Sequence, residues 1–311
     1  MIEQPINRNE TCFFSIVIPT YNRKVDVLNL LATIYQQTYS HYEVIVCDDC
    51  STDDSVPHIK LNYPDVKIIQ LDNNSGPAVA RNKGIKSAMG EVIIGLDSDV
   101  LLPDNDFLAQ VNQLFHIPQL FGAAFRIQNY YSERDDSGRW WHPLPIEKFR
   151  DKPFWTDYFS GTGYAFRREV FEKAGYYPED LFMDMEENDL AFRLLEAGID
   201  IRYSPEVWVI HKASEVSKNE KIQFYYKRRN QFWVACRYYP WWKIPLYMIP
   251  RWIKTFFSAL RHQKLNLYFL SLKDSITNIP TIVMTRKPLS PTTWRKIYLI
   301  KKRLYKGKQS L

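Results

Sequence analysis

Two aspartates one residue apart, Asp97 and Asp99, directly follow the apolar run Val92–Leu96. The run has the length and composition of a buried strand, which would leave both carboxylates at the carboxyl end of that strand. Paired carboxylates there suit a divalent cation that prefers oxygen ligands and is shared with a diphosphate. The alternative is an acidic turn after a strand, and an Asp-x-Asp alone does not decide between the two.

A second acidic pair, Asp48 and Asp49, ends another apolar run and precedes a polar turn. A carboxylate in this place could accept hydrogen bonds from the N–H groups of a nucleobase. Alternatively, the turn caps a helix, with Ser51 or Thr52 as the capping residue. The two interpretations are compatible, because the cap leaves Asp49 free to point into a crevice.

Two isolated side chains could complete a site for a diphosphate and a metal ion. Arg81, in the helix expected after Gly76, is a permanent cation that could meet a phosphate group. His211 ends the apolar run Val207–Ile210, and its imidazole with two carboxylates would suit Mn²⁺ or Mg²⁺. The plainer alternatives are a solvated arginine and a structural or exposed histidine.

Glu187 lies near the start of an expected helix. Its neighbours on one helix face are apolar: Leu190, Ala191 and Leu194. Its carboxylate should therefore point inward, where it could serve as a general base beside an acceptor. Asp189 precedes Arg193 by four residues, the spacing of an ion pair on a helix surface. Alternatively, Glu187 is an acidic residue of the first helical turn, where the helix dipole favours negative charge. That explanation suits Glu186 at least as well.

The residues that position these side chains alternate between β-rich and helical stretches. We expect strands over Phe13–Ile18, Val44–Cys47, Val66–Ile69 and Val92–Leu96, and helices over Val25–Gln36, Ser55–Lys60 and Val79–Ala88. This order predicts an α/β fold with a Rossmann-like, mostly parallel sheet flanked by helices. Ligands bind beyond the carboxyl ends of such strands, so the polar residues that follow them should share one crevice.

The second half of the chain is less regular. Residues 128–158 are polar and aromatic with three prolines, which predicts a long irregular stretch of the kind that often carries function. Beyond it come Ser160–Gly163 and a helix over about 187–197 that Gly198 ends.

From about Trp241 the composition shifts to aromatic, basic and proline residues. Trp241–Phe257 is apolar, but basic residues and prolines interrupt it too often for a helix that spans a membrane. We expect this stretch to lie on an anionic membrane surface, and helices that merely cover the catalytic core are the alternative. Nucleic acid is not expected as a partner, because the region carries neither zinc-ligand spacing nor an RNA-binding motif.

The length and composition of the whole chain limit the class of protein to which it can belong. It has 311 residues, 45% of them hydrophobic, and a formal charge of +6, so it can bury a large core. The first residues lack a basic segment followed by an apolar run, so we expect no secretory signal and a cytoplasmic protein. Four cysteines do not make a disulfide framework. Cys47 and Cys50 form a lone C-x-x-C without a second ligand pair, which favours ordinary thiols over a zinc or redox site.

Six segments in this order resemble the inverting nucleotide-sugar glycosyltransferases of family 2, which have the GT-A fold: SIVIPTYNR, VIVCDDCSTDD, NNSGPAVARNKGI, GLDSD, SGTGYAFRRE and MEENDLAFRLLEAG. The resemblance runs from about Ser15 to His211. It implies a catalytic domain over 12–215, with a donor half over about 12–100 and an acceptor half over about 101–215. A helical, aromatic and basic extension over 216–311 would follow.

The resemblance also implies roles for single residues. Glu187 falls where the family usually has the second residue of a Glu-Asp pair, its catalytic base. The divalent ion, Mn²⁺ or Mg²⁺, is expected on Asp97, Asp99 and His211. The donor is expected to contact Pro19, Tyr21, Asp49, Gly76, Arg81 and Asp97. The acceptor is expected to contact Trp155, Gly161 and Thr162.

The expected reaction moves one sugar from a UDP- or dTDP-linked donor to a hydroxyl of a glycan or lipid-linked acceptor, in cell-surface polysaccharide or lipopolysaccharide biosynthesis. The Gln-x-x-Arg-Trp signature of processive synthases is absent, with Lys227–Asn230 in that region, which favours a non-processive enzyme. A sugar-phosphate nucleotidyltransferase is one alternative, but it should carry a Gly-rich loop where this chain has Pro19–Asn22. A non-catalytic carbohydrate-binding protein is the other, and it has no use for a metal site with an inward glutamate.

Overall fold

The computed structural model describes residues 11–212 and 220–307. Its strands are β1 Phe14–Thr20, β2 Tyr42–Asp48, β3 Lys67–Gln70, β4 Val92–Leu96, β5 Val100–Leu101, β6 Gly122–Asn129, β7 Phe154–Thr156, β8 Gly163–Arg167 and β9 Ile201–His211. Its helices are α1 Lys24–Ile34, α2 Ser55–Asn62, α3 Pro77–Ser87, α4 Phe107–Phe115, α5 Ile146–Phe149, α6 Glu169–Ala174, α7 Glu186–Glu196, α8 Glu220–Tyr238, α9 Lys243–Arg261, α10 Leu265–Thr277, α11 Ile279–Met284 and α12 Pro291–Lys301.

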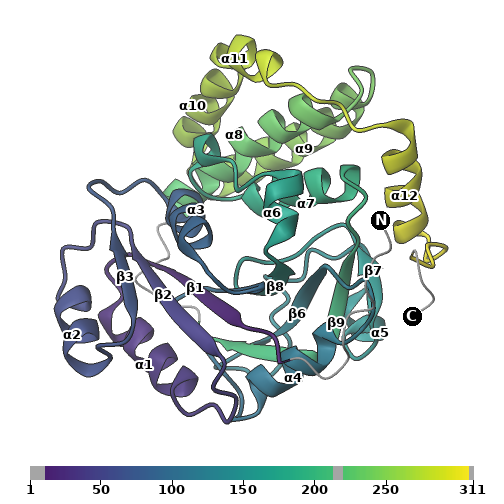
Figure 1. The fold of residues 1–311 in the computed structure, drawn as a ribbon. Coiled ribbons are helices and arrows are strands. Elements are labelled where there is room, and N and C mark those ends of the chain that lie inside the picture. The colour runs from purple at the N-terminus through teal and green to yellow at the C-terminus, as the bar shows by residue number, and fades with distance from the viewer. Residues whose placement is uncertain (1–10, 213–219, 308–311) are drawn as a thin grey trace.

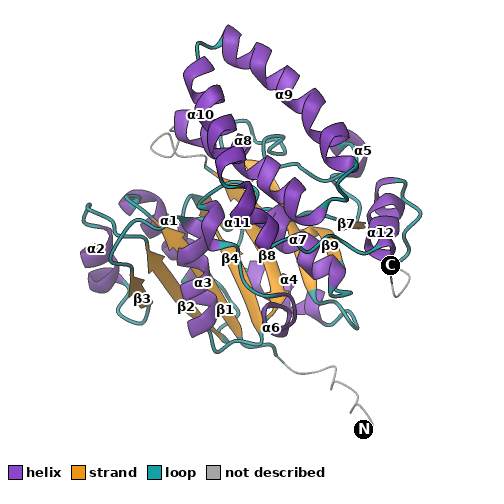
Figure 2. Ribbon diagram, turned by 90° about the horizontal axis from the view of Figure 1, so that it is seen from above, coloured by secondary structure: helices purple, strands orange, loops and turns teal. Residues whose placement is uncertain are grey.

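The strands join in one sheet in the order β3-β2-β1-β4-β8-β6-β9-β5, and β7 pairs with β9. The first four strands are parallel, as the alternation of strands and helices predicts. Beyond them β8 runs antiparallel to both β4 and β6, so the second half of the sheet is mixed. Helices cover both faces (Figure 1, Figure 2). The predicted α/β fold is confirmed.

The centre of the sheet is buried from both sides, so β1 and β4 are buried over their whole length and are largely apolar. Side chains alternate along β1: Ile16 and Ile18 pack in the core formed with α1 and α4, whereas Val17 packs in the core formed with α3. Helix α3 comes very close to the sheet at Gly84, where a Cβ would lie 2.5 Å from a Val17 methyl group. This close approach fixes the position of the helix that carries Arg81.

The C-terminal helices pack on the rest of the molecule at α7 and, through α12, near β7 (Figure 1). One core cluster joins Phe192 and Leu195 of α7 to residues of α8, α9, α11 and α12, among them Phe232, Ile244 and Ile297. These helices therefore cover the outer side of α7, while α9 also exposes apolar side chains. Across residues 11–212 and 220–307, no helix combines the length and the apolar character needed to span a membrane.

Candidate active site

Sheet pairing brings the Asp-x-Asp next to two other predicted segments. The last residue of β4 pairs with the first residue of β8, which puts Thr162 beside Asp97. The first residue of β5 pairs with His211, the last residue of β9, which puts this histidine beside Asp99. Thr162 and His211 therefore meet the two carboxylates at one end of the sheet. They lie 65 positions after Asp97 and 112 positions after Asp99, respectively.

Asp97 is held by two donors. Nη2 of Arg81 lies 2.5 Å from its Oδ1, and the hydroxyl of Thr162 donates to its Oδ2 at 3.0 Å. Arg81 is buried, and its Nη1 lies 3.5 Å from Oε1 of Glu186, so the alternative of a solvated arginine is wrong. Burial alone would raise the pKa of Asp97, but the guanidinium of Arg81 outweighs burial and holds this pKa below its usual range.

Asp99 and His211 form the second part of the site. Nε2 of His211 lies 3.7 Å from Oδ2 of Asp99, and its Nδ1 donates to Oδ2 of Asp136 at 2.7 Å. The carboxylate of Asp136 orients the ring so that Nε2 faces the Asp-x-Asp, an arrangement common around metal-bound histidines. Nη1 of Arg23 lies 2.5 Å from Asp99. Although burial opposes them, His211 and Arg23 hold the pKa of Asp99 well below its usual value.

These donors fit a divalent ion that accepts oxygen and imidazole ligands. Oδ1 of Asp99 is buried and has no hydrogen-bond partner, so it offers a lone pair to an ion. Both oxygens of Asp97 already accept hydrogen bonds. Asp97 can therefore bind an ion only through an oxygen that Arg81 or Thr162 also contacts. Within the described ranges, no group of three His, Cys, Asp or Glu side chains is arranged to hold a metal ion. Asp99 and His211 are the better-placed ligands.

Two glutamates open α7 and differ in their surroundings. Glu186 is buried beside Arg81, and its Oε2 has no hydrogen-bond partner. Glu187 is half-buried, and its Oε1 accepts the N–H of Gly161 at 3.1 Å. Burial raises the pKa of both carboxyls, and the charge of Glu187 raises that of Glu186 further. Glu186 thus serves as a partner of Arg81, whereas Glu187 is the one with access to a bound molecule.

One prediction about α7 is wrong. Asp189 is buried rather than on the helix surface. Its Oδ1 accepts from Nε of Arg193 at 2.8 Å, as the four-residue spacing predicts, but its Oδ2 lies 3.3 Å from Nη1 of Arg237 in α8. The four-residue spacing predicts the ion pair of Asp189 and Arg193 within α7. It does not show that α8 covers this pair.

Asp49 anchors the loop before α3. The N–H groups of Ser75 and Gly76 donate to its two oxygens at 2.7 and 2.8 Å. Gly76 has φ +90°, and a Cβ there would lie 2.6 Å from the carbonyl oxygen of Phe182, so this position requires glycine. The carboxylate that we expect beside a nucleobase therefore also fixes the start of the helix that carries Arg81.

The other two predicted donor residues lie at the end of β1. Pro19 is buried within the strand, whereas Tyr21 just beyond it is 42% exposed. Asn22 has φ +51° and accepts the N–H of Thr52 at 2.7 Å, which ties the end of β1 to the turn after β2. Tyr21 is thus free to contact a ligand, and Pro19 shapes the strand beneath it.

Trp155, which we expect at the acceptor, lies in β7 with its side chain half-buried. Its indole packs against Gly307, where a Cβ would come within 2.4 Å of its Nε1. A cavity of about 190 Å³ lies beside α7, and its lining includes Trp141, Tyr158, Met185 and Asn188. The last two flank the pair of glutamates in the chain, so this cavity offers aromatic surface near the candidate base.

A segment with unusual backbone precedes α7. Its left-handed residues are Phe182, Asp184 and Met185, with φ between +63° and +74°. The buried side-chain amide of Asn230 in α8 donates to backbone carbonyls of this segment at 2.7–2.8 Å, those of Leu181, Met183 and Asp184. Residues other than glycine adopt this conformation rarely. The C-terminal helices therefore hold the segment that presents Glu187.

Sequence reasoning missed three charged residues near the Asp-x-Asp: Arg23, Asp136 and Arg139. Arg23 directly follows the polar end of β1, and that position is a signal that could have identified it. Asp136 and Arg139 lie in the irregular stretch 128–158, where no periodicity shows which side chains turn toward the sheet. Nη2 of Arg139 lies 3.4 Å from Nε2 of His211.

The fold is that of GT-A glycosyltransferases, as two solved structures illustrate. Mannosyltransferase PcManGT from Pyrobaculum calidifontis, in complex with GDP-Man and Mn²⁺, matches with a TM-score of 0.58 at 19% identity, over 97% of this chain and 87% of its own. GalNAc-T7 with UDP, GalNAc and Mn²⁺ matches with a TM-score of 0.60 at 19% identity, over 76% and 49%.

Residues 15–175 match the family model described as glycosyl transferase family 2, so the chain belongs to that family, as predicted. The Escherichia coli protein named UDP-Glc:alpha-D-GlcNAc-diphosphoundecaprenol beta-1,3-glucosyltransferase WfaP is 37% identical over 39% of this chain and 47% of its own. The Staphylococcus aureus poly(ribitol-phosphate) beta-N-acetylglucosaminyltransferase TarS is 38% identical over 28% and 16%. The chain thus spans less than half the length of each of these relatives.

Proposed function

We propose that this protein transfers one sugar from a nucleoside diphosphate donor to a hydroxyl group of an acceptor, with inversion at the anomeric carbon and without processive elongation. The observation that carries this proposal is the cluster around Asp97. Arg81 links that carboxylate to α7, and Gly161 and Thr162 contact the cluster from the other side. A candidate base thus lies beside a candidate diphosphate site.

Glu187 would act as the general base. It would take the proton of the acceptor hydroxyl while that oxygen attacks the anomeric carbon from the face opposite the diphosphate. One bond to the anomeric carbon forms as the bond to the phosphate oxygen breaks, so a single displacement inverts the configuration. The raised pKa of Glu187 favours this role, because a more basic carboxylate accepts a proton more readily.

Asp99 and His211 would hold Mn²⁺ or Mg²⁺, with Asp97 sharing an oxygen. When bound, the ion would supply positive charge to the departing diphosphate. Arg23 and Arg139 add permanent positive charge beside Asp99 and His211. Asp136 would keep the imidazole in the orientation that an ion requires.

The donor would lie at the carboxyl ends of β1 and β2, with its base near Tyr21 and Asp49. The name of WfaP supports a sugar nucleotide as donor, since it specifies UDP-Glc. We favour a UDP- or dTDP-linked sugar. The acceptor would enter the cavity lined by Trp141 and Asn188, and a glycan on a lipid carrier at the cytoplasmic face of a membrane suits the diphosphoundecaprenol in the name of WfaP.

Release of the nucleotide product tests this function against its alternatives. The purified protein is incubated with UDP-, dTDP- and GDP-linked sugars, with Mn²⁺ or with EDTA. Release of a nucleoside diphosphate that depends on Mn²⁺ supports a glycosyltransferase. Release of pyrophosphate from a nucleoside triphosphate and a sugar phosphate would instead identify a nucleotidyltransferase. No turnover, with sugar binding retained, would identify a carbohydrate-binding protein.

Substitution of Gly161 by alanine should lower turnover while the fold survives. The new Cβ would lie 2.5 Å from Nη2 of Arg81 and 2.6 Å from Oε1 of Glu187, so both side chains must move. Misplacing a catalytic group by about 1 Å can cost on the order of 100-fold in rate. Steady-state kinetics should show the loss in kcat. Thr162→Ser keeps the hydroxyl beside Asp97 and serves as control, and wild-type kcat in Gly161→Ala would contradict the proposed arrangement.

A further inference from the structure

Helix α9 exposes a continuous apolar stripe. Its members recur every three or four residues, and each is at least 50% exposed: Leu246, Ile249, Ile253, Phe257 and Leu260. This spacing puts them on one face of the helix. The opposite face is buried, with Ile244, Met248 and Ala259 in the molecule's interior. The helix is therefore held in place from within, and the side chains of its outward apolar face stay at least half exposed.

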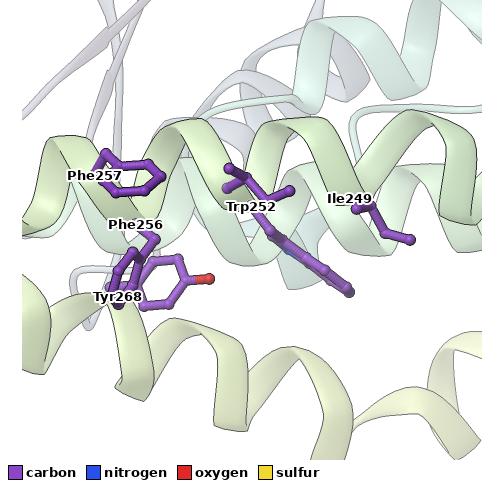
Figure 3. A pocket seen from close by; sticks show the side chains of 6 residues that line it. Ile249, Trp252, Phe256, Phe257 and Tyr268 are labelled. Carbon is purple, nitrogen blue, oxygen red and sulfur yellow. The ribbon is translucent and has the colours of Figure 1, made fainter.

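Helix α10 extends this face. It packs beside α9 and exposes Phe269 and Ile276, and Met284 at the end of α11 is 87% exposed. An apolar groove of about 420 Å³ runs between α9 and α10, lined by side chains such as Trp252, Phe256 and Tyr268 (Figure 3). We call this combined surface of α9 and α10 the apolar face. Exposed apolar surface that is this continuous marks a site of interaction.

Positive charge borders the apolar face. Residues 241–290 contain eight Lys or Arg and one Asp, although the whole chain is nearly balanced, with 41 basic and 35 acidic residues. Lys254 and Arg261 each follow a stripe residue by one position and are exposed, so they lie along the same edge of the stripe. An apolar face with a basic border complements the acyl chains and phosphates of an anionic bilayer.

The same helix reaches the candidate acceptor cavity. Tyr247 and Arg251 of α9 line that cavity together with Asn188 of α7. Each lies two residues from Ile249 of the stripe, so the cavity lies on the side of α9 that faces away from the stripe. A surface that the stripe entered would therefore lie about one helix diameter, on the order of 10 Å, from the cavity lining.

We propose that the apolar face docks this protein on an anionic phospholipid bilayer. The stripe of α9 and Phe269 of α10 enter the boundary between head groups and acyl chains, and Lys254 and Arg261 meet the lipid phosphates. Docking brings the cavity beside α7 to within about one helix diameter of the lipid surface, where a lipid-linked acceptor lies. The role of the acceptor rests on the proposed function, but docking itself does not.

Vesicle flotation with the full chain and no substrate tests the proposal. Vesicles of phosphatidylcholine alone are compared with vesicles that also contain phosphatidylglycerol. We expect binding to the anionic vesicles that weakens as salt rises. The double variant Ile253→Ser/Phe257→Ser should lose about tenfold or more in binding at every salt concentration, because it removes buried apolar area. Lys254→Glu/Arg261→Glu should lose binding to the anionic vesicles.

The matched control is Leu61→Ser/Met89→Ser, which removes two exposed apolar side chains outside the C-terminal helices and should bind as the wild type does. Wild-type protein that binds neither vesicle type, or an Ile253→Ser/Phe257→Ser variant that binds normally, overturns the proposal. So does a wild-type dimer that this variant converts to a monomer without any vesicle binding, since the face would then join two copies. Nucleotide release, measured in parallel without vesicles, separates failure of docking from failure of the proposed function.

Discussion

Replacing Asp99 with asparagine should abolish Mn²⁺-dependent transfer. The change removes the charge of a proposed metal ligand but keeps the volume of the side chain, so the packing around it survives. Loss of the charge stabilisation that a metal ion gives to a leaving diphosphate is worth several kcal/mol, or about a thousandfold or more in rate. Nucleoside diphosphate release measures turnover, and the free Mn²⁺ signal in electron paramagnetic resonance measures binding of the ion.

Asp65→Asn is the matched control, because Asp65 is exposed ahead of β3 and far along the chain from the cluster. It should retain turnover and Mn²⁺ binding. Near-ultraviolet circular dichroism of Asp99→Asn should match the wild type, which separates loss of the ion from loss of the fold. Unchanged Mn²⁺ binding and turnover in Asp99→Asn would remove this residue from the metal site.

Glu187→Gln should lower turnover by about 10²- to 10⁴-fold and leave donor binding nearly unchanged, as expected when a general base is removed. The amide still reaches the N–H of Gly161 but cannot take a proton. Calorimetric titration with the donor measures binding, and single-turnover kinetics measure the chemical step. A fall in donor affinity without a fall in turnover would make Glu187 a donor contact instead.

The pH dependence of turnover also tests the role of Glu187 as a general base. Only ionised Glu187 can accept a proton, and burial raises its pKa above the ordinary glutamate value. Turnover of the wild type should therefore fall as the pH drops through that raised pKa, whereas the residual turnover of Glu187→Gln should lack this limb. Glu187→Asp, which restores a carboxylate on a shorter arm, should regain part of the rate together with the limb.

Much of the donor half could be predicted from the sequence, because its elements are local. The strand Val92–Leu96 is correct to the residue, and the bounds of the first three strands and helices are correct to within two residues. Short apolar runs bounded by polar turns carry that information within a few residues. The residues that follow these strands do meet at one end of the sheet, as strand direction alone requires.

The contacts that complete the site could not be predicted, because they depend on pairings distant in the chain. Nothing near Asp136 indicates that it orients His211, 75 residues later. Helical periodicity predicts an inward Glu187, which is half-buried, but it does not show that the neighbouring Glu186 is the more buried of the two and the partner of Arg81. The burial of Asp189 likewise depends on α8, which the spacing within α7 does not reveal.

The hydrogen bonds of Asn230 bear on how this protein could be modified. A designer who wished to give the catalytic domain a new tail would naturally cut after residue 215 and attach a foreign helical segment. That cut would remove the amide that restrains three left-handed residues just before Glu186 and Glu187. Chimeras should therefore retain α8, or carry an asparagine at the equivalent point of the graft, because α8 restrains the segment that presents the candidate base and is not an interchangeable module.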